Sequence, residues 1–292
     1  MRNRKNVGLL FLSALLCVQT SHAQYKVPEK QYKIAAIDLM MLKRQKLGAV
    51  QLANQVGVEG LEVDMGGLGQ RETFDNKLIV DSIRKQYIDK TNEFKVEICS
   101  LGMTGYYAQS FCERASFIPS IQDCINTMKL LNVKVGFLPL GIQCDLVKKP
   151  ALRDSVISRL RVAGQLAQDA GVVIGIETAL DAKGEKQLLK DIGFTSIRSY
   201  FNFSNPLKNG RDLIKELKIL GKKYIVQIHC TDDDGVLLKD NTRLDMQQVK
   251  KTLDKMGWTG WLVLERSRDA KEPNNVKKNF GANATYMKSI FQ

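Results

Sequence analysis

The feature that most constrains the fold is an alternation of short apolar runs with longer stretches of helical period, which continues from residue 33 to the C-terminus. Each run has the length and the β-branched content of a buried strand, and the stretches between runs carry apolar residues at helical spacing. Eight predicted strands result, at 33–40, 60–65, 95–103, 134–140, 172–178, 198–204, 224–232 and 260–267. Helical stretches separate them, and a last one near 275–290 closes the chain.

This strict alternation predicts a parallel sheet, because each helix returns the chain to the same edge of the sheet. Eight βα units in about 260 residues match the size of a closed barrel. The alternative is an open doubly wound sheet, which usually has a glycine-rich phosphate turn. The nearest candidate, GGLGQ at 66–70, lacks the GxGxxG spacing. We therefore predict an α/β fold with a single (β/α)8 TIM barrel over residues 24–292.

Capping residues indicate where several of the helices begin and end. Ser120 precedes an apolar helical pattern and is expected to be its N-cap. Gly171, Gly221 and Gly257 each follow a helical pattern and are expected to end it.

Residues 1–23 have the organisation of a cleavable export signal. The first six residues carry three positive charges and precede the apolar stretch 7–18. A small-x-small cleavage site ends at Ala23. The apolar stretch is short for a bilayer span, and no other segment is long and apolar enough to cross a membrane. We expect a secreted or periplasmic protein that starts at Gln24; an uncleaved anchor is the alternative.

The charge distribution and the cysteines indicate which classes of partner and metal site are not expected. The net charge of +13 falls to +10 without the three charges of the signal, and the basic residues are scattered along helices rather than gathered with aromatics. This pattern favours a solvated basic surface over nucleic-acid binding. The cysteines show no CxxC spacing, so a zinc knuckle is not expected, whereas one disulfide that includes Cys112 is compatible with export.

Polar residues stand at the ends of four consecutive predicted strands, where barrels of this type carry their active sites. They are Glu177, Asn202, His229 and Glu265. Two carboxylates, an amide oxygen and an imidazole nitrogen suit Mn²⁺, Co²⁺ or Mg²⁺, and Zn²⁺ less distinctively. Each residue alone has a simpler explanation, such as a satisfied structural histidine or a turn-capping amide. Their joint placement favours a site for one divalent metal ion.

Short motifs at these strand ends resemble those of the xylose isomerase-like TIM barrels, the sugar phosphate isomerase/epimerase superfamily. The motifs are IGIET, YFNFSN, VQIHCTD and GWLVLE, with GVEGLEVDM near the start. The resemblance implies a divalent metal held by Glu, Asp, His and Glu. This set carries over to Glu177, Asn202, His229 and Glu265, with an amide at the Asp position. The resemblance also places Glu62 and Asn205 toward a substrate.

The resemblance implies an isomerase or epimerase that acts on a carbohydrate. In this reaction a carboxylate removes a proton next to a carbonyl and the metal stabilises the resulting enediolate. Glu177 and Glu265 are the expected catalytic pair. Asp232 is a candidate to orient His229 or to bind a hydroxyl. Arg243 is a candidate to hold an anionic or hydroxylated substrate end, with a plain surface arginine as the alternative.

Two other functions stay open at this point. The same residues suit a metal-dependent lyase or hydrolase of keto-sugars or 3-keto-glycosides, and a non-catalytic sugar-binding barrel whose metal site is degenerate at Asn202. A DNA-repair nuclease is disfavoured. Such enzymes bind a cluster of metal ions through several histidines, and this chain has one histidine outside the signal. Export favours a free sugar, a glycoside or an oxidised sugar as substrate. The oligomeric state stays open, a homo-oligomer included.

Overall fold

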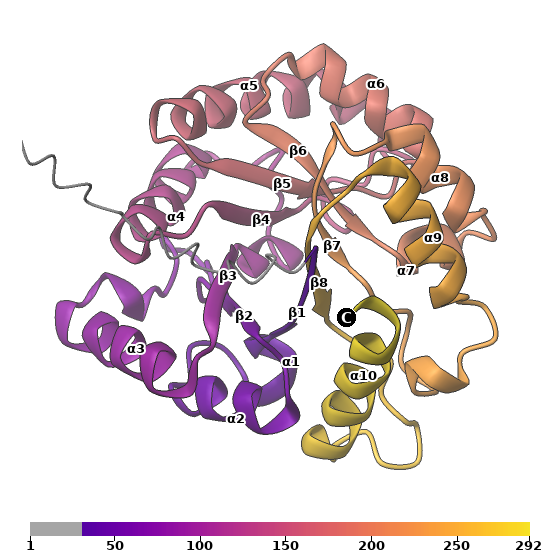
Figure 1. The fold of residues 1–292 in the computed structure, drawn as a ribbon. Helices are drawn as coiled ribbons and strands as arrows, with labels where there is room; N and C mark the ends of the chain where they lie inside the picture. Colours follow the sequence, from indigo (N-terminus) through magenta and orange to yellow (C-terminus); the bar gives the residue numbers. More distant parts are fainter. Residues whose placement is uncertain (1–30) are drawn as a thin grey trace, which may run out of the picture.

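The computed structural model describes residues 31–292 and contains a closed eight-stranded barrel surrounded by helices (Figure 1). The predicted export signal lies outside the described residues. All neighbouring strands are parallel, and β8 pairs with β1 to close the barrel. The strands are β1 Tyr32–Ile37, β2 Gly60–Asp64, β3 Glu97–Gly102, β4 Val135–Pro139, β5 Val173–Glu177, β6 Ile197–Asn202, β7 Ile225–His229 and β8 Gly260–Leu264. The predicted single (β/α)8 barrel and its eight strands are confirmed.

Helices follow the strands and form the outer layer in Figure 1. The α-helices are α1 Asp38–Leu42, α2 Gly48–Val56, α3 Asp81–Phe94, α4 Phe117–Leu131, α5 Arg153–Asp169, α6 Ala182–Ile192, α7 Ser204–Lys208, α8 Leu213–Leu220, α9 Met246–Met256 and α10 Val276–Phe291. Short 3₁₀ helices are η1 Lys77–Ile79, η2 Thr104–Tyr107, η3 Pro150–Leu152 and η4 Leu238–Asp240. Within residues 31–292, none of the helices has both the length and the apolar character that a bilayer span requires.

Helix ends agree with the sequence in part. Gly221 and Gly257 directly follow α8 and α9, and Gly257 adopts the left-handed φ of 62° that favours glycine. The predicted N-cap Ser120 is wrong. Helix α4 already begins at Phe117, and the Ser120 hydroxyl donates back to the Phe117 carbonyl at 2.8 Å.

Apolar side chains fill two regions of the molecule. A large cluster lies between the strands and the helices, and a smaller one lies inside the barrel. The inner cluster contains Ala35, Cys99, Phe137, Tyr200 and Val263. This inner cluster lies beneath the polar residues at the carboxyl ends of the strands.

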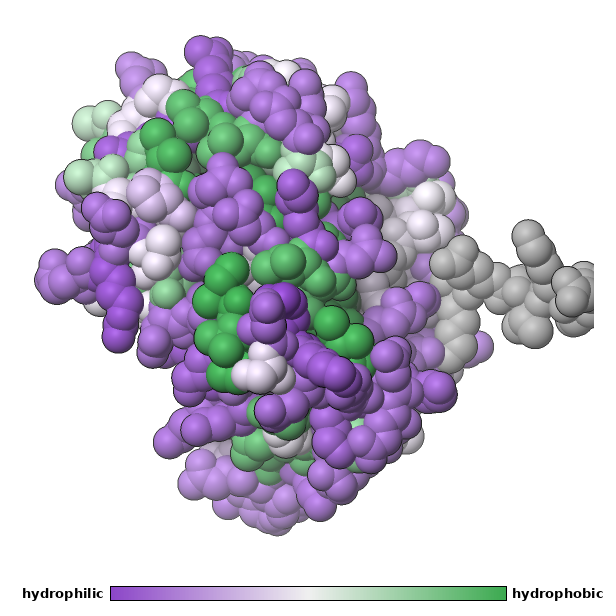
Figure 2. Space-filling model, turned by 90° about the vertical axis from the view of Figure 1, so that its left-hand side faces the viewer, coloured by the Kyte–Doolittle hydropathy of each residue, from purple (hydrophilic) through white to green (hydrophobic). Residues whose placement is uncertain are grey.

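The outer surface is mostly hydrophilic on the face that Figure 2 shows, with hydrophobic side chains gathered in patches between the polar ones. Exposed large apolar residues occur on η1 and the helices that follow, among them Ile79, Ile88, Ile118 and Leu130. Much of the surface of any folded domain is apolar, so these side chains carry no argument about the oligomeric state.

Candidate active site at the carboxyl ends of the strands

Four side chains meet at the carboxyl rim of the barrel. Glu177, Asn202 and His229 are the last residues of β5, β6 and β7, and Glu265 directly follows β8. The Nδ1 atom of His229 lies 3.5 Å from Glu177 Oε2 and 4.0 Å from Glu265 Oε2. The Nδ2 atom of Asn202 lies 3.2 Å from each of the same two oxygens. The structure therefore brings together the four residues that the sequence singled out as one site.

The other ring nitrogen of His229 faces into the barrel. Nε2 lies 3.4 Å from Glu62 Oε1, and the ring packs against Phe137 and Tyr200 with centroids 4.7 and 4.5 Å away. The second oxygen of Glu62 accepts hydrogen bonds from the hydroxyls of Tyr200 and Ser100. These contacts fix the orientation of the imidazole.

The position of Glu62 differs from the expected substrate contact. Its side chain is completely buried beneath His229, and the cavity at the rim is not lined by it. The strand that carries Glu62 was predictable from the sequence, but how deeply its side chain lies in the barrel was not. The contacts favour a role in orienting His229.

A cavity of about 170 Å³ opens beside the four side chains. Glu177, Asn202 and Glu265 form part of its wall, and so does the predicted substrate residue Asn205. The wall also includes Tyr107, Lys208 and Arg266, which the sequence analysis did not identify. Arg266 directly follows the strand-end Glu265, and this adjacency is a signal that could have identified it. Tyr107 and Lys208 belong to η2 and α7, whose approach to the rim has no signal in the sequence.

Asp232 and Arg243 are paired with each other and do not line this cavity. The Arg243 guanidinium donates to both carboxylate oxygens of Asp232, at 2.7 Å each. The Asp232 carboxylate also accepts from the Asn241 amide, while its backbone N–H donates to the Ser267 hydroxyl. Within residues 31–292, the hydrogen bonds and ion pair of Asp232 go to partners other than His229, so the expectation that it orients the imidazole finds no support. The pair instead holds the loop after β7.

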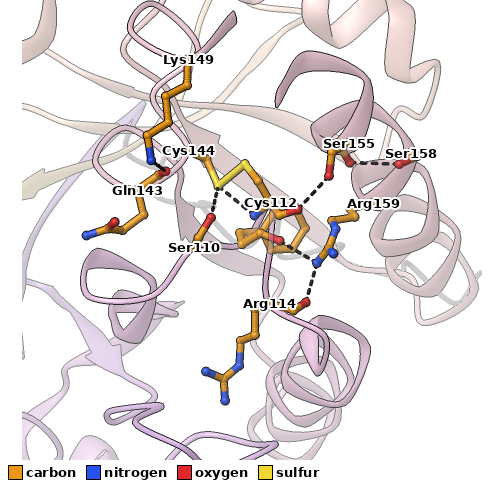
Figure 3. Close-up of a disulfide and its surroundings, with 10 residues drawn as sticks. Ser110, Cys112, Arg114, Gln143, Cys144, Lys149, Ser155, Ser158 and Arg159 are labelled. Atoms are coloured by element: carbon orange, nitrogen blue, oxygen red, sulfur yellow. Dashed lines mark hydrogen bonds between the residues drawn. A yellow bond between two sulfur atoms is a disulfide. The ribbon is translucent and has the colours of Figure 1, made fainter. Parts of the chain in front are cut away.

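A disulfide joins the two loops that form one side of the cavity (Figure 3). Cys112 lies in the loop after β3 and Cys144 in the loop after β4. The same loops carry Tyr107 and Ile142 to the cavity wall. The expectation of one disulfide that includes Cys112 agrees with this bond. The other cysteines among the described residues, Cys99, Cys124 and Cys230, are free and buried.

Comparisons with known proteins identify the family. The sequence profile described as "xylose isomerase-like TIM barrel" matches residues 16–290. The chain belongs to this family. The resemblance seen in the strand-end motifs is thereby confirmed.

Proteins similar to this xylose isomerase-like barrel include epimerases. It is 23% identical over 190 residues to the 2-epi-5-epi-valiolone 7-phosphate 2-epimerase of Actinoplanes sp., covering 63% of this chain and 67% of that protein. Among solved structures it resembles the D-psicose 3-epimerase of Clostridium cellulolyticum H10 with D-tagatose, at a TM-score of 0.70 and 11% identity over 89% of this chain and 99% of that one. It also resembles the IOLI protein with a bound zinc atom, at a TM-score of 0.66 and 15% identity over 89% and 99%.

Glu177, His229 and Glu265 carry donor atoms of the kinds that divalent cations bind in proteins. Ligands of one cation with bonds of about 2.1 Å lie roughly 3–4 Å apart, as His229 Nδ1 does from the two glutamate oxygens. A carboxylate behind the second ring nitrogen, here Glu62, is the usual outer partner of a ligating histidine. Within residues 31–292, no group of three or more His, Cys, Asp or Glu side chains has an arrangement that could hold a metal ion. The donors would therefore have to draw closer on binding.

Asn202 presents the wrong atom for a metal ligand. Its Oδ1 accepts a hydrogen bond from the Ser204 backbone N–H at 2.9 Å, and its Nδ2 faces the two glutamates. An amide nitrogen only donates hydrogen bonds and does not coordinate cations. The physical reason is that α7 begins directly after β6, and the first N–H groups of a helix require an acceptor. The expected role of Asn202 as an oxygen ligand is not realised in this conformation.

The electrostatics of the site follow from burial and from like charges. Burial alone lowers the pKa of His229, but the facing carboxylates of Glu62, Glu177 and Glu265 outweigh it and raise that pKa to about 10. Burial raises the pKa of Glu265, as does the charge of Glu177, while His229 lowers it. In the protein alone, the imidazole therefore carries a positive charge that faces these acidic side chains.

Proposed function

We propose that the protein is a sugar isomerase or epimerase that transfers a proton at a carbon next to a carbonyl group. The single observation that carries the proposal is the pair of glutamates at the rim. Glu177 and Glu265 come from strands on either side of Asn202 and His229, and both line the same cavity. Two carboxylates in different surroundings can divide the work, one removing the proton and the other returning it.

The surroundings of the two glutamates suggest which does which. Burial raises the pKa of Glu265, and we assign this carboxyl as the proton donor. Glu177 is the more exposed of the two, with 18% of its side chain accessible against 7% for Glu265, and we assign it as the base. The two residues exchange roles in the reverse reaction.

A divalent cation is part of the proposal. Glu177, His229 Nδ1 and Glu265 would hold it, and it would supply positive charge to the substrate oxygen that becomes negative when the proton leaves. Mn²⁺, Co²⁺ and Mg²⁺ suit the mixed oxygen and nitrogen donors, and the zinc in the IOLI protein makes Zn²⁺ a further candidate.

The substrate class rests on the relatives and on the expected export signal. The Actinoplanes relative and the D-psicose 3-epimerase are both epimerases by name. A secreted or periplasmic protein meets free sugars, glycosides and oxidised sugars rather than intracellular sugar phosphates. We therefore propose a sugar or keto-sugar of this kind as the substrate.

Exchange of substrate protons with solvent deuterium tests the reaction. The purified protein is incubated in D₂O with free sugars, keto-sugars and glycosides, with Mn²⁺, Co²⁺ or Mg²⁺ added, and deuterium in the sugar is followed by NMR. We expect Glu177→Gln and Glu265→Gln each to slow exchange by about 10²-fold or more. Glu72→Gln, at an exposed position in the loop after β2, is the matched control and should leave exchange unchanged.

The same experiment separates the alternative functions. Release of an aglycone or of an unsaturated sugar would indicate the hydrolase or the lyase. Sugar binding without exchange under all metals would indicate the non-catalytic barrel. Full exchange in either glutamine variant would remove that glutamate from the mechanism.

A further inference from the structure

The amide of Asn202 lies between the two glutamates and donates to both. Its Nδ2 is 3.2 Å from Glu177 Oε2 and 3.2 Å from Glu265 Oε2. These are the same oxygens that face His229 Nδ1, and hence the oxygens that a cation at this site would use. The amide hydrogens carry partial positive charge, so the amide and a cation compete for the same lone pairs.

The orientation of this amide is determined by its other end. The Ser204 backbone N–H donates to Asn202 Oδ1 at 2.9 Å. Turning the amide over would place its NH₂ group against that N–H and its oxygen against two carboxylates. Both new contacts would be repulsive, and three hydrogen bonds at buried or partly buried atoms would be lost. The amide oxygen is therefore not available as a cation ligand.

We propose that Asn202 is an internal competitor of the divalent cation: its NH₂ group bridges Glu177 and Glu265 in the cation-free protein, and a cation binds through three side chains only after this bridge is broken. The inference rests on the proposed cation but not on the proposed reaction. It makes residue 202 one determinant of metal affinity at this rim. Together with the His229 imidazole, the bridge gives both carboxyl groups a hydrogen-bond partner before a cation arrives.

An aspartate at position 202 would behave differently. One of its oxygens can accept the Ser204 N–H, and the other is free to face the cation. The substitution removes the competing donor and adds one negative charge next to the binding position, so both effects strengthen cation binding. An alanine removes the bridge and adds no ligand.

The test measures metal binding directly. Purified protein is titrated with Mn²⁺, and free Mn²⁺ is measured by electron paramagnetic resonance, so that no substrate or turnover is needed. We expect Asn202→Asp to lower the Kd for Mn²⁺ by about tenfold or more, and Asn202→Ala to bind Mn²⁺ at least as tightly as the unaltered protein. Asn209→Asp adds the same charge at an exposed position after α7 and should change the Kd by much less.

Two results would overturn the proposal. A weaker Kd by tenfold or more in Asn202→Ala, with the fold intact by circular dichroism, would show that the amide oxygen is a ligand. A Kd in Asn202→Asp no lower than in Asn209→Asp would show that the bridge does not oppose the cation, and this arm holds even if the alanine variant does not fold. Deuterium exchange is measured in a separate experiment. Absence of the proposed reaction would therefore not change what the two Kd comparisons show.

Discussion

The buried network behind His229 connects the rim of the barrel to its interior. Glu62 faces the imidazole with one oxygen and accepts hydroxyl hydrogen bonds from Tyr200 and Ser100 with the other. The Gln227 amide donates in turn to these two hydroxyl oxygens. These donors hold the Glu62 carboxylate in one orientation, with an oxygen 3.4 Å from His229 Nε2, so the environment of the imidazole depends on residues deep in the barrel.

Glu62→Gln tests this dependence. The amide keeps the shape of the side chain but removes the negative charge behind the imidazole, so His229 becomes a weaker and less well oriented ligand. We expect the Kd for Mn²⁺ to rise by about 10–100-fold, as is typical for outer partners of ligating histidines. Ser100→Ala removes one donor to Glu62 but keeps its charge, and should cause a smaller change. Equal Mn²⁺ binding by Glu62→Gln and the unaltered protein would contradict the positioning role.

Glu185 on α6 predicts a pH dependence of stability. Burial raises its pKa to about 7 from 4.5, although the Thr178 hydroxyl donates to it. The folded state thus holds its proton to higher pH than the unfolded state. The stability that the protonated carboxyl contributes is complete below about pH 4.5 and is lost as the pH rises through about 7.

Glu185→Gln should remove this dependence, because the amide does not ionise. The variant should gain roughly 3 kcal/mol of unfolding free energy relative to the unaltered protein between pH 4.5 and pH 8, since one pKa unit corresponds to about 1.4 kcal/mol. Urea unfolding followed by tryptophan fluorescence at several pH values measures it. Glu113→Gln, on the exposed surface, is the control. Parallel pH profiles for Glu185→Gln and the unaltered protein would refute the assignment.

At the scale of elements, the disulfide stabilises the loops after β3 and β4. It closes a chain segment with a sequence separation of 32, and its neighbours tie it to α5, where the Ser155 hydroxyl donates to the Cys112 carbonyl (Figure 3). The Gln143 amide also donates to the Tyr107 carbonyl across the two loops. The cavity wall that contains Tyr107 and Ile142 is therefore held in place by a covalent bond.

Removal of this bond should affect both stability and substrate binding. In the chain-entropy account, a closed segment of this length contributes roughly 3–4 kcal/mol to the unfolding free energy. We expect the double variant Cys112→Ser, Cys144→Ser to melt at a lower temperature and to show a raised KM with a smaller change in kcat. Cys230→Ser, a buried free thiol in the same protein, controls for the loss of a sulfur atom. An unchanged KM would show that the loops hold their positions without the bond.

The elements also show what the sequence could predict. Periodicity revealed all eight strands, because buried parallel strands are nearly continuous apolar runs. It placed the end of the first strand too late: the apolar residues continue, but Asp38 starts α1 and its buried carboxylate accepts hydrogen bonds from the backbone N–H groups of Gln45 and Asp64. When apolar residues continue from a strand into a helix, their pattern does not show where the strand ends.

The site was predictable where it depends on topology and not where it depends on loops. Glu177, Asn202, His229 and Glu265 meet because successive parallel strands end at one rim. The burial of Glu62, the pairing of Asp232 with Arg243 and the choice of amide atom at Asn202 depend on partners distant in sequence or on the exact start of a helix. Spacing along the chain does not encode these contacts.

At the scale of the whole molecule, export remains a prediction that protein chemistry can test. If residues 1–23 are an export signal, the full-length gene product expressed in a bacterium should be recovered from the periplasm or medium, with Gln24 as its first residue by intact mass. The same preparation should contain the disulfide, and a version without the leader, made in the cytoplasm, should contain two additional thiols. A product that keeps the leader in the membrane fraction would favour the uncleaved anchor instead.

The seam between β1 and β8 has a consequence for how such a protein is made. Residues 32–36 of the first strand align with residues 260–264 of the last, so the cylinder stays open until almost the entire polypeptide has been synthesised. Any product cut short before the last strand would leave the free flanks of both β1 and β7 as templates for pairing with other chains. A late premature stop codon should therefore yield aggregates and degradation products rather than a smaller working protein.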